Sequence, residues 1–251
     1  MCQSVHNARM RITDTSDLWW KTAVIYCLDV ETFLDWNDDG RGDFIGLVQR
    51  IDYLADLGVT CLWLMPFYPT PDRDDGYDIT DFYGVDRHLG THGDLVEVIR
   101  TARDRGIRVI ADLVVNHTSD QHPWFRSARS SKDSPYRDWY VWRDEPPPGS
   151  EVEPVFPDQE TSAWELDAKT KQYYLHRFYR HQPDLNVTNP VVRDEIVKNH
   201  GVLAGVGAVR LPRRRRAFSD RDDGGRRCRR GVARPARISA HPARFSRPPQ
   251  W

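Results

Sequence analysis

The chain has 251 residues with a formal net charge of −1, and 39% of its residues are hydrophobic. This size and composition support one large folded domain or two, and they exclude a compositionally disordered protein. No run of eighteen apolar residues could span a bilayer and the N-terminus lacks a signal pattern, so we expect a cytoplasmic protein without a membrane partner. The four cysteines form no CxxC pair and predict ordinary thiols rather than a disulfide framework or zinc site: Cys2, Cys27, Cys61 and Cys228.

The near-zero net charge conceals two segments of opposite charge. Residues 1–198 contain 22 Lys+Arg and 34 Asp+Glu, a net charge of −12. Residues 199–251 contain 14 Arg, 3 Asp and neither Lys nor Glu, a net charge of +11. Such a change near Lys198 is compatible with a nucleic-acid-binding tail, or with a tail that is translated in a different frame from the rest.

Apolar runs alternate with amphipathic segments in residues 23–115. Buried strands are predicted at residues 23–29, 60–65 and 107–115, because these runs are rich in β-formers and lack polar alternation. Helices are predicted at residues 44–57 and from about residue 94, with Thr91 and Asp94 as a capping box and Gly106 as the stop. This order is typical of a parallel sheet covered by helices, as in an α/β barrel or a doubly wound sheet.

Residues 118–189 interrupt this rhythm with a proline-rich segment and many aromatic side chains. An insertion after a third barrel strand would overhang the carboxyl ends of the strands, where barrel active sites lie. Its aromatic residues are interpreted as a small core, as platforms for sugar rings, or as both: Trp124, Trp139, Tyr140, Trp142 and Trp164. The predicted organisation is an N-terminal extension (1–17), three βα units (18–117), an inserted subdomain (118–189), the start of a third barrel helix (190–198) and a disordered, arginine-rich tail (199–251).

Two polar segments follow predicted strands at the same edge of the sheet. Asp112, Asn116 and His117 close the third strand, where pleat alternation would point Asp112 and Asn116 to one side. Asp74 and Tyr77 lie in a loop after the second strand, where a carboxylate beside an aromatic ring suits a polyhydroxylated ligand. The alternatives are a simple chain turn for the first segment and an ordinary acidic loop for the second.

Residues 35–43 place oxygen-bearing side chains at alternate positions around a glycine, which is the pattern of a calcium loop. The pattern lacks the final glutamate and the preceding helix of an EF-hand. A solvated acidic turn is therefore the alternative interpretation.

Nearly all of residues 18–198 resembles the α-amylase superfamily of glycoside hydrolases (family 13), through motifs in this order: WWKTAVIY, DWNDDGRGDF, DDGYDI, DLVVNH, TSDQHPWF, DWYVW and HQPDLN. The motifs are most similar to the branch of trehalose synthases and oligo-1,6-glucosidases. The resemblance implies the N-terminal part, about three βα units, of a (β/α)8 TIM barrel. It also implies a retaining enzyme for maltose- or trehalose-like α-glucosides, with isomerisation of maltose to trehalose expected first and α-glucosidase or oligo-1,6-glucosidase hydrolysis as the alternative.

The resemblance implies a role for each matching residue. Four side chains would contact substrate: Asp74, Tyr77, His117 and Gln182. Two neighbours, Asp112 and Asn116, would support the site through hydrogen bonds. A structural Ca²⁺ would be held by Asp35, Asn37, Asp39, the backbone carbonyl of Arg41, and Asp43.

A retaining glycosidase needs a carboxylate nucleophile and a carboxylic acid about 5 Å apart, which the resemblance places on the fourth and fifth barrel strands. Neither strand is recognisable in the chain. Each residue can be encoded by only a few codons, so the residues that a shifted reading frame could encode are also restricted. When codons for residues 209–219 are read one base later, they can encode FDFRVDAVPF, which contains the fourth-strand motif FRVDAVP. The same shift over residues 199–205 permits IMGFWL. We therefore expect a frameshift at or just after Lys198, and an inactive, poorly soluble product.

Two other classes of function compete with this interpretation. Clustered arginines at residues 213–216 and 226–230 attract phosphate, but no recognition motif surrounds them, so a nucleic-acid partner is not favoured. The second alternative is a noncatalytic remnant that binds sugar or calcium. Such a remnant would bind maltose without turnover.

Overall fold

The computed structural model describes residues 18–147 and 153–205. These residues belong to the first of two compact units, Met1–Pro212, and the second unit, Arg213–Trp251, lies outside the described residues. The predicted N-terminal extension, most of the predicted tail and both arginine clusters therefore lie outside them too. Within the described ranges, no helix combines the length and the apolar composition needed to cross a bilayer.

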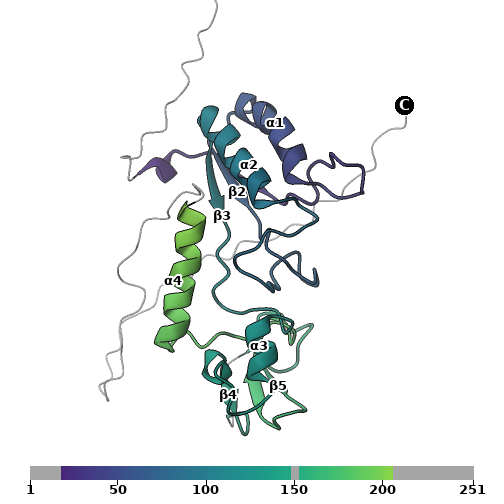
Figure 1. Cartoon of the computed structure of the whole chain (residues 1–251), viewed down its shortest axis with the longest axis vertical. Coiled ribbons are helices and arrows are strands. Elements are labelled where there is room, and N and C mark those ends of the chain that lie inside the picture. The colour runs from purple at the N-terminus through teal and green to yellow at the C-terminus, as the bar shows by residue number, and fades with distance from the viewer. Residues whose placement is uncertain (1–17, 148–152, 206–251) are drawn as a thin grey trace, which may run out of the picture. The chain divides into compact units, whose positions relative to one another are not determined.

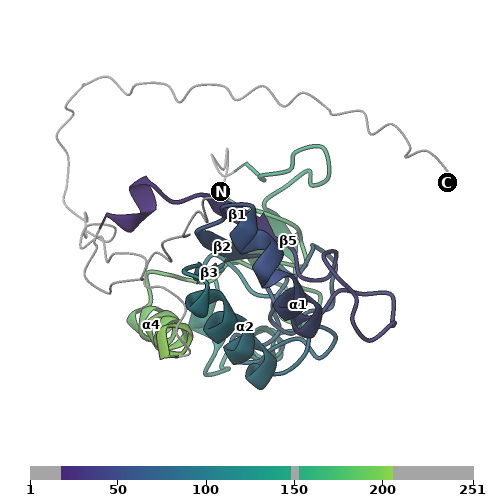
Figure 2. The same cartoon turned by 90° about the horizontal axis from the view of Figure 1, so that it is seen from above.

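Three parallel strands form the main sheet in the order β1-β2-β3: β1 (Ile25–Leu28), β2 (Cys61–Leu64) and β3 (Arg108–Ala111). A short 3-10 helix, η1 (Trp19–Lys21), precedes β1. Helices α1 (Phe44–Asp56) and α2 (His92–Asp104) connect the strands and lie side by side against the sheet (Figures 1 and 2). The predicted alternation of three strands with two helices is confirmed.

The two faces of this sheet differ in what covers them. Leu62 and Leu64 of β2 are fully buried and share the core with Leu47 of α1. Side chains alternate along a strand, so Ile25 and Trp63 lie on the opposite face, where they are 48% and 39% exposed. In the described part of the chain, the main sheet thus has one packed face and one face with apolar side chains in solvent.

Local capping interactions fix where the two helices begin. The Asp43 side chain accepts a hydrogen bond from the Gly46 N–H at 2.7 Å at the start of α1. Thr91 and Asp94 form a reciprocal capping box at the start of α2, and Gly106, with φ at 77°, follows its end. The predicted capping box is confirmed.

The third strand is shorter than the predicted range 107–115. β3 ends at Ala111, where its partner β2 ends at Leu64, and the ladder has no further strand residues with which to pair. Asp112 and Asn116 consequently lie in the loop after β3. The prediction that pleat alternation points these two side chains to one side is wrong, because they are not part of the pleat.

Residues within the predicted insertion form a small antiparallel sheet in the order β4-β6-β5: β4 (Trp142–Arg143), β5 (Trp164–Leu166) and β6 (Tyr173–Leu175). Helix α3 (Pro123–Ala128) contacts the 3-10 helix η2 (Arg137–Trp139). The ring of Phe125 makes edge contacts with Tyr140 and Tyr174, at centroid distances of 4.9 and 5.1 Å, and stacks on Trp142. These aromatic side chains form a core, as the first of the two interpretations predicted.

Helix α4 (Pro190–Gly205) begins at the predicted residue and continues beyond Lys198. Asn189 caps it, because its Oδ1 accepts a hydrogen bond from the Val191 N–H at 3.0 Å. Val192 and Asn199 are buried on one face of this helix.

Candidate functional site

Three loops meet beyond the carboxyl end of the main sheet. They follow β2, β3 and β6, and backbone hydrogen bonds join them in pairs. The Ser119 N–H donates to the Ile79 carbonyl at 2.8 Å, and the Leu185 N–H donates to the Asn116 carbonyl at 2.8 Å. The structure therefore brings the two polar segments, residues 74–78 and 112–117, to one region, as predicted.

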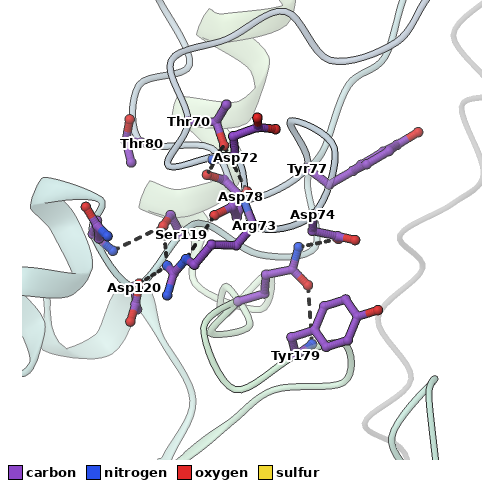
Figure 3. A network of polar contacts seen from close by, with 12 residues as sticks. Thr70, Asp72, Arg73, Asp74, Tyr77, Asp78, Thr80, Ser119, Asp120 and Tyr179 are labelled. Carbon is purple, nitrogen blue, oxygen red and sulfur yellow. Dashed lines mark hydrogen bonds and ion pairs between the residues drawn. The ribbon is translucent and has the colours of Figure 1, made fainter. Parts of the chain in front are cut away.

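Asp74 and Gln182 contact each other although they are far apart in sequence. The Gln182 Nε2 donates to Asp74 Oδ2 at 2.7 Å, and the Gln182 Oε1 accepts from the Tyr179 N–H at 3.2 Å (Figure 3). Gln182 is fully buried, whereas Asp74 is half-buried. A fixed amide thus orients a carboxylate that still reaches solvent, where it can accept hydrogen bonds from hydroxyl groups.

Tyr77 and Asp112 form the second polar pair of the site. The Tyr77 hydroxyl donates to Asp112 Oδ2 at 3.0 Å. Burial, together with the charge of Asp112, raises the pKa of Tyr77 to about 12, so the phenol stays protonated at neutral pH. Both side chains are half-buried and leave part of their surface open to a ligand.

His117 is buried and uses both ring nitrogens within the protein. Its Nε2 lies 3.2 Å from the Tyr77 carbonyl, which can only accept, and its Nδ1 lies 3.3 Å from Asn116 Nδ2, which can only donate. Burial lowers the pKa of His117 to about 4, so the ring is neutral at physiological pH. The ring thus supports the Tyr77 loop, and the sugar contact of His117 stays a prediction.

Asn116 links the loop after β3 to the loop after β6. Its Nδ2 donates to Asp184 Oδ1 at 2.9 Å, and the Arg177 N–H donates to the same oxygen at 3.1 Å. Burial raises the pKa of Asp184 to about 6 despite these donors and the nearby Arg177 charge. The predicted loop-supporting role of Asn116 agrees with this geometry, and Asp184 is its unpredicted partner.

A second charged network was not predicted from the sequence. Arg73 contacts the buried Asp78 and reaches Ser119 and Asp120 in the next loop (Figure 3). Arg73 and Asp78 flank the glycine turn of DDGYDI, and Asp120 belongs to TSDQHPWF. The charges of Asp78 and Asp120 within these motifs, and of Arg73 directly before the first, were the available signal, but which of them pair depends on how the loops fold together.

The predicted calcium loop carries donors of the right chemistry. All five proposed ligands offer oxygen atoms, as Ca²⁺ requires, and the loop turns through positive φ at Asp38 and Gly40. The Asp35 carboxylate accepts from the Asp38 and Gly40 N–H groups, each at 2.7 Å, and the Asp43 carboxylate accepts from Gly46 and Trp36. Among the described residues, no three His, Cys, Asp or Glu side chains are gathered tightly enough to hold a metal ion. The donor set therefore fits Ca²⁺ chemically, and its side chains would have to converge on the ion.

Comparison with known proteins matches residues 27–208 to the catalytic domain of α-amylases. The chain is 49% identical over 191 residues to the trehalose synthase/amylase of Mycolicibacterium smegmatis, covering 76% of this chain and 32% of that relative. It is 48% identical over 178 residues to an oligo-1,6-glucosidase of Heyndrickxia coagulans, covering 71% and 32%. A solved structure, trehalose-6-phosphate hydrolase of Bacillus licheniformis, matches with a TM-score of 0.71 at 41% identity, covering 76% of this chain and 34% of that one.

The chain spans about a third of the length of these curated relatives. The matched region contains the end of β1, the whole of β2 and β3, the small antiparallel sheet and all three loops of the site. Motif order, fold and comparison agree: the chain belongs to the α-amylase catalytic-domain family.

Proposed function

We propose that the chain carries the N-terminal third of a retaining enzyme that acts on α-glucosidic bonds of maltose-like sugars. The convergence of Asp74, Gln182, Tyr77 and Asp112 carries this proposal, because half-buried carboxylate, amide and phenol groups are suited to sugar hydroxyls. In this proposal residues 18–117 are the first three βα units of a TIM barrel, residues 118–189 are inserted above them, and residues 190–198 begin the third barrel helix. The location proposed is the cytoplasm.

Maltose-to-trehalose isomerisation is the reaction we favour, since a relative at 49% identity is a trehalose synthase/amylase. In such a reaction a glucosyl group bound covalently to the enzyme returns to the released glucose before water reacts with it. Hydrolysis is the second candidate, because an oligo-1,6-glucosidase is almost as similar. Both candidates use α-glucosides, so the site of Asp74 and Tyr77 serves either one.

We expect the chain as it stands to bind maltose, and Asp74→Asn to weaken that binding by about tenfold, because a charge-assisted hydrogen bond is lost. Asp75→Asn is the matched control. Asp75 is the next residue and lines a different pocket, with Asp29 and Asp86, so this substitution should leave the affinity unchanged. Titration of maltose followed by saturation-transfer NMR measures both. Equal affinities in the two variants, or no binding by the wild type, would rule out the site.

We further propose that residues 35–43 hold a structural Ca²⁺. A free Ca²⁺ concentration of 100 times Kd should add about 2.7 kcal/mol to the free energy of unfolding and raise the melting temperature. Asp35→Asn should abolish this gain, whereas Asp38→Asn should keep it, since Asp38 is outside the proposed ligand set and Asn tolerates its φ of 62°. Melting curves with Ca²⁺ and with chelator provide the measurement. Identical wild-type curves in both would exclude the ion.

A further inference from the structure

The guanidinium of Arg73 lies where the loop after β2 meets the loop after β3. Its Nε contacts Asp78 Oδ2 at 3.3 Å, and its Nη2 donates to Ser119 Oγ at 3.2 Å and to Asp120 Oδ1 (Figure 3). Arg73 therefore links a carboxylate of its own loop to a carboxylate of the neighbouring loop.

Asp78 anchors the inner side of the Arg73 loop. It is 0% exposed, and its Oδ1 accepts from Thr70 Oγ1 at 2.8 Å and from the Arg73 N–H at 3.2 Å. A buried carboxylate is stable only when it is paired and hydrogen-bonded, so these contacts are needed for folding. The contact between Arg73 and Asp120 is different, because it crosses to another loop and both side chains are partly exposed.

The turn that presents Asp74 and Tyr77 begins at the residue after Arg73. The Tyr77 N–H donates to the Asp74 carbonyl at 2.8 Å and closes this turn. Inside it, Asp75 has φ at 44° and Gly76 at 82°. A non-glycine residue with positive φ stores strain, which the surrounding structure has to oppose.

We propose that Arg73 is a positioning residue, which holds the turn of Asp74 and Tyr77 in its sugar-binding geometry by pairing with Asp120. The inference rests on the proposed sugar site, because Arg73 would act through the turn of Asp74 and Tyr77 rather than by binding the sugar itself. Without the pair, the turn can move away from the loop after β3, which carries Asp112. Sugar affinity then falls although the buried Asp78 keeps its partners.

Asp120→Asn tests this role in the chain as it exists. The substitution removes the charge in the neighbouring loop but keeps the Asp78 contacts, and the backbone N–H at position 120 still donates to the His181 carbonyl. Asp52→Asn is the control, because Asp52 also pairs with an arginine that is 35% exposed, Arg105, at 2.6 Å; Asp52 itself is 72% exposed and Asp120 is 27% exposed.

Two measurements test the role of Arg73 separately from the existence of the sugar site. Hydrogen exchange of residues 70–80, followed by mass spectrometry without sugar, should be several-fold faster in Asp120→Asn than in the wild type or in Asp52→Asn. Maltose affinity should fall about tenfold in Asp120→Asn alone. Unchanged exchange in Asp120→Asn would overturn the role of Arg73, as would faster exchange with unchanged affinity. A wild type that binds no maltose would instead overturn the sugar site, and exchange would still report whether Arg73 holds the turn.

Discussion

Deleting one base directly after the codon for Lys198 is expected to restore the barrel frame and to give an enzyme that acts on maltose, whereas the chain as it stands should show no turnover. The shifted frame permits FRVDAVP, which supplies the aspartate that the family uses as nucleophile. A retaining glycosidase needs both its nucleophile and its acid, so turnover should rise by about three orders of magnitude or more when the restored frame supplies this aspartate and continues into the fifth strand, which carries the acid. Chromatography of trehalose and glucose formed from maltose measures the change.

The control for this experiment is the same restored chain with the aspartate of FRVDAVP replaced by asparagine. We expect this variant to fold but to form neither product. Trehalose as the main product would identify a synthase, and glucose alone would identify a hydrolase. Turnover by the original chain, or activity in the asparagine control, would contradict the frameshift account.

Asn199→Ile is expected to raise the free energy of unfolding by about 1–3 kcal/mol. Asn199 is 4% exposed, and among the described residues its buried Oδ1 has no hydrogen-bond partner. It lies beside Val114 and Ile196 in a mostly apolar pocket. An unsatisfied buried polar group costs about 1–3 kcal/mol. The shifted frame permits isoleucine at this first position after Lys198, which is the residue that the apolar helix environment favours.

Asn189→Ile, the same substitution at the residue directly before this helix, should have the opposite effect. Asn189 caps α4 through the Val191 N–H, and loss of such a cap costs about 1 kcal/mol. For a chain of this size, a change of 1 kcal/mol shifts the melting temperature by roughly 2–4 °C. Thermal melts of the two variants should therefore move in opposite directions. A fall in melting temperature for Asn199→Ile would contradict this expectation and show that the Asn199 amide stabilises the fold.

The elements that the sequence predicted well are those fixed by local signals. Uninterrupted apolar runs marked the three parallel strands, and Thr91 with Asp94 marked the start of α2. The end of β3 was not predictable from its own residues, because three apolar residues, 113–115, follow Asp112 and look like a continuation of the strand. A strand ends where its neighbour stops pairing, and β2 stops at Leu64.

The site residues that belong to a recognised motif were predicted. The contacts between residues of different loops were not predicted. Asp74, Tyr77, Asp112 and Gln182 belong to quoted motifs, and the structure brings them together. The contacts Arg73–Asp120 and Asn116–Asp184 join residues 47 and 68 positions apart. No periodicity or spacing indicates such pairs, because the loop geometry that creates them depends on the packing of the whole fold.

The most direct test of the account is to resequence the gene across the codons for Asp194 to Val209. The account predicts that these codons, read one base later after Lys198, run through isoleucine at position 199 and on to FRVDAVP. The corrected gene, or an intact close relative, should then encode one continuous α-amylase domain. Codons that cannot encode this motif in the shifted frame would contradict the account, and would leave the arginine-rich tail as a genuine part of the protein.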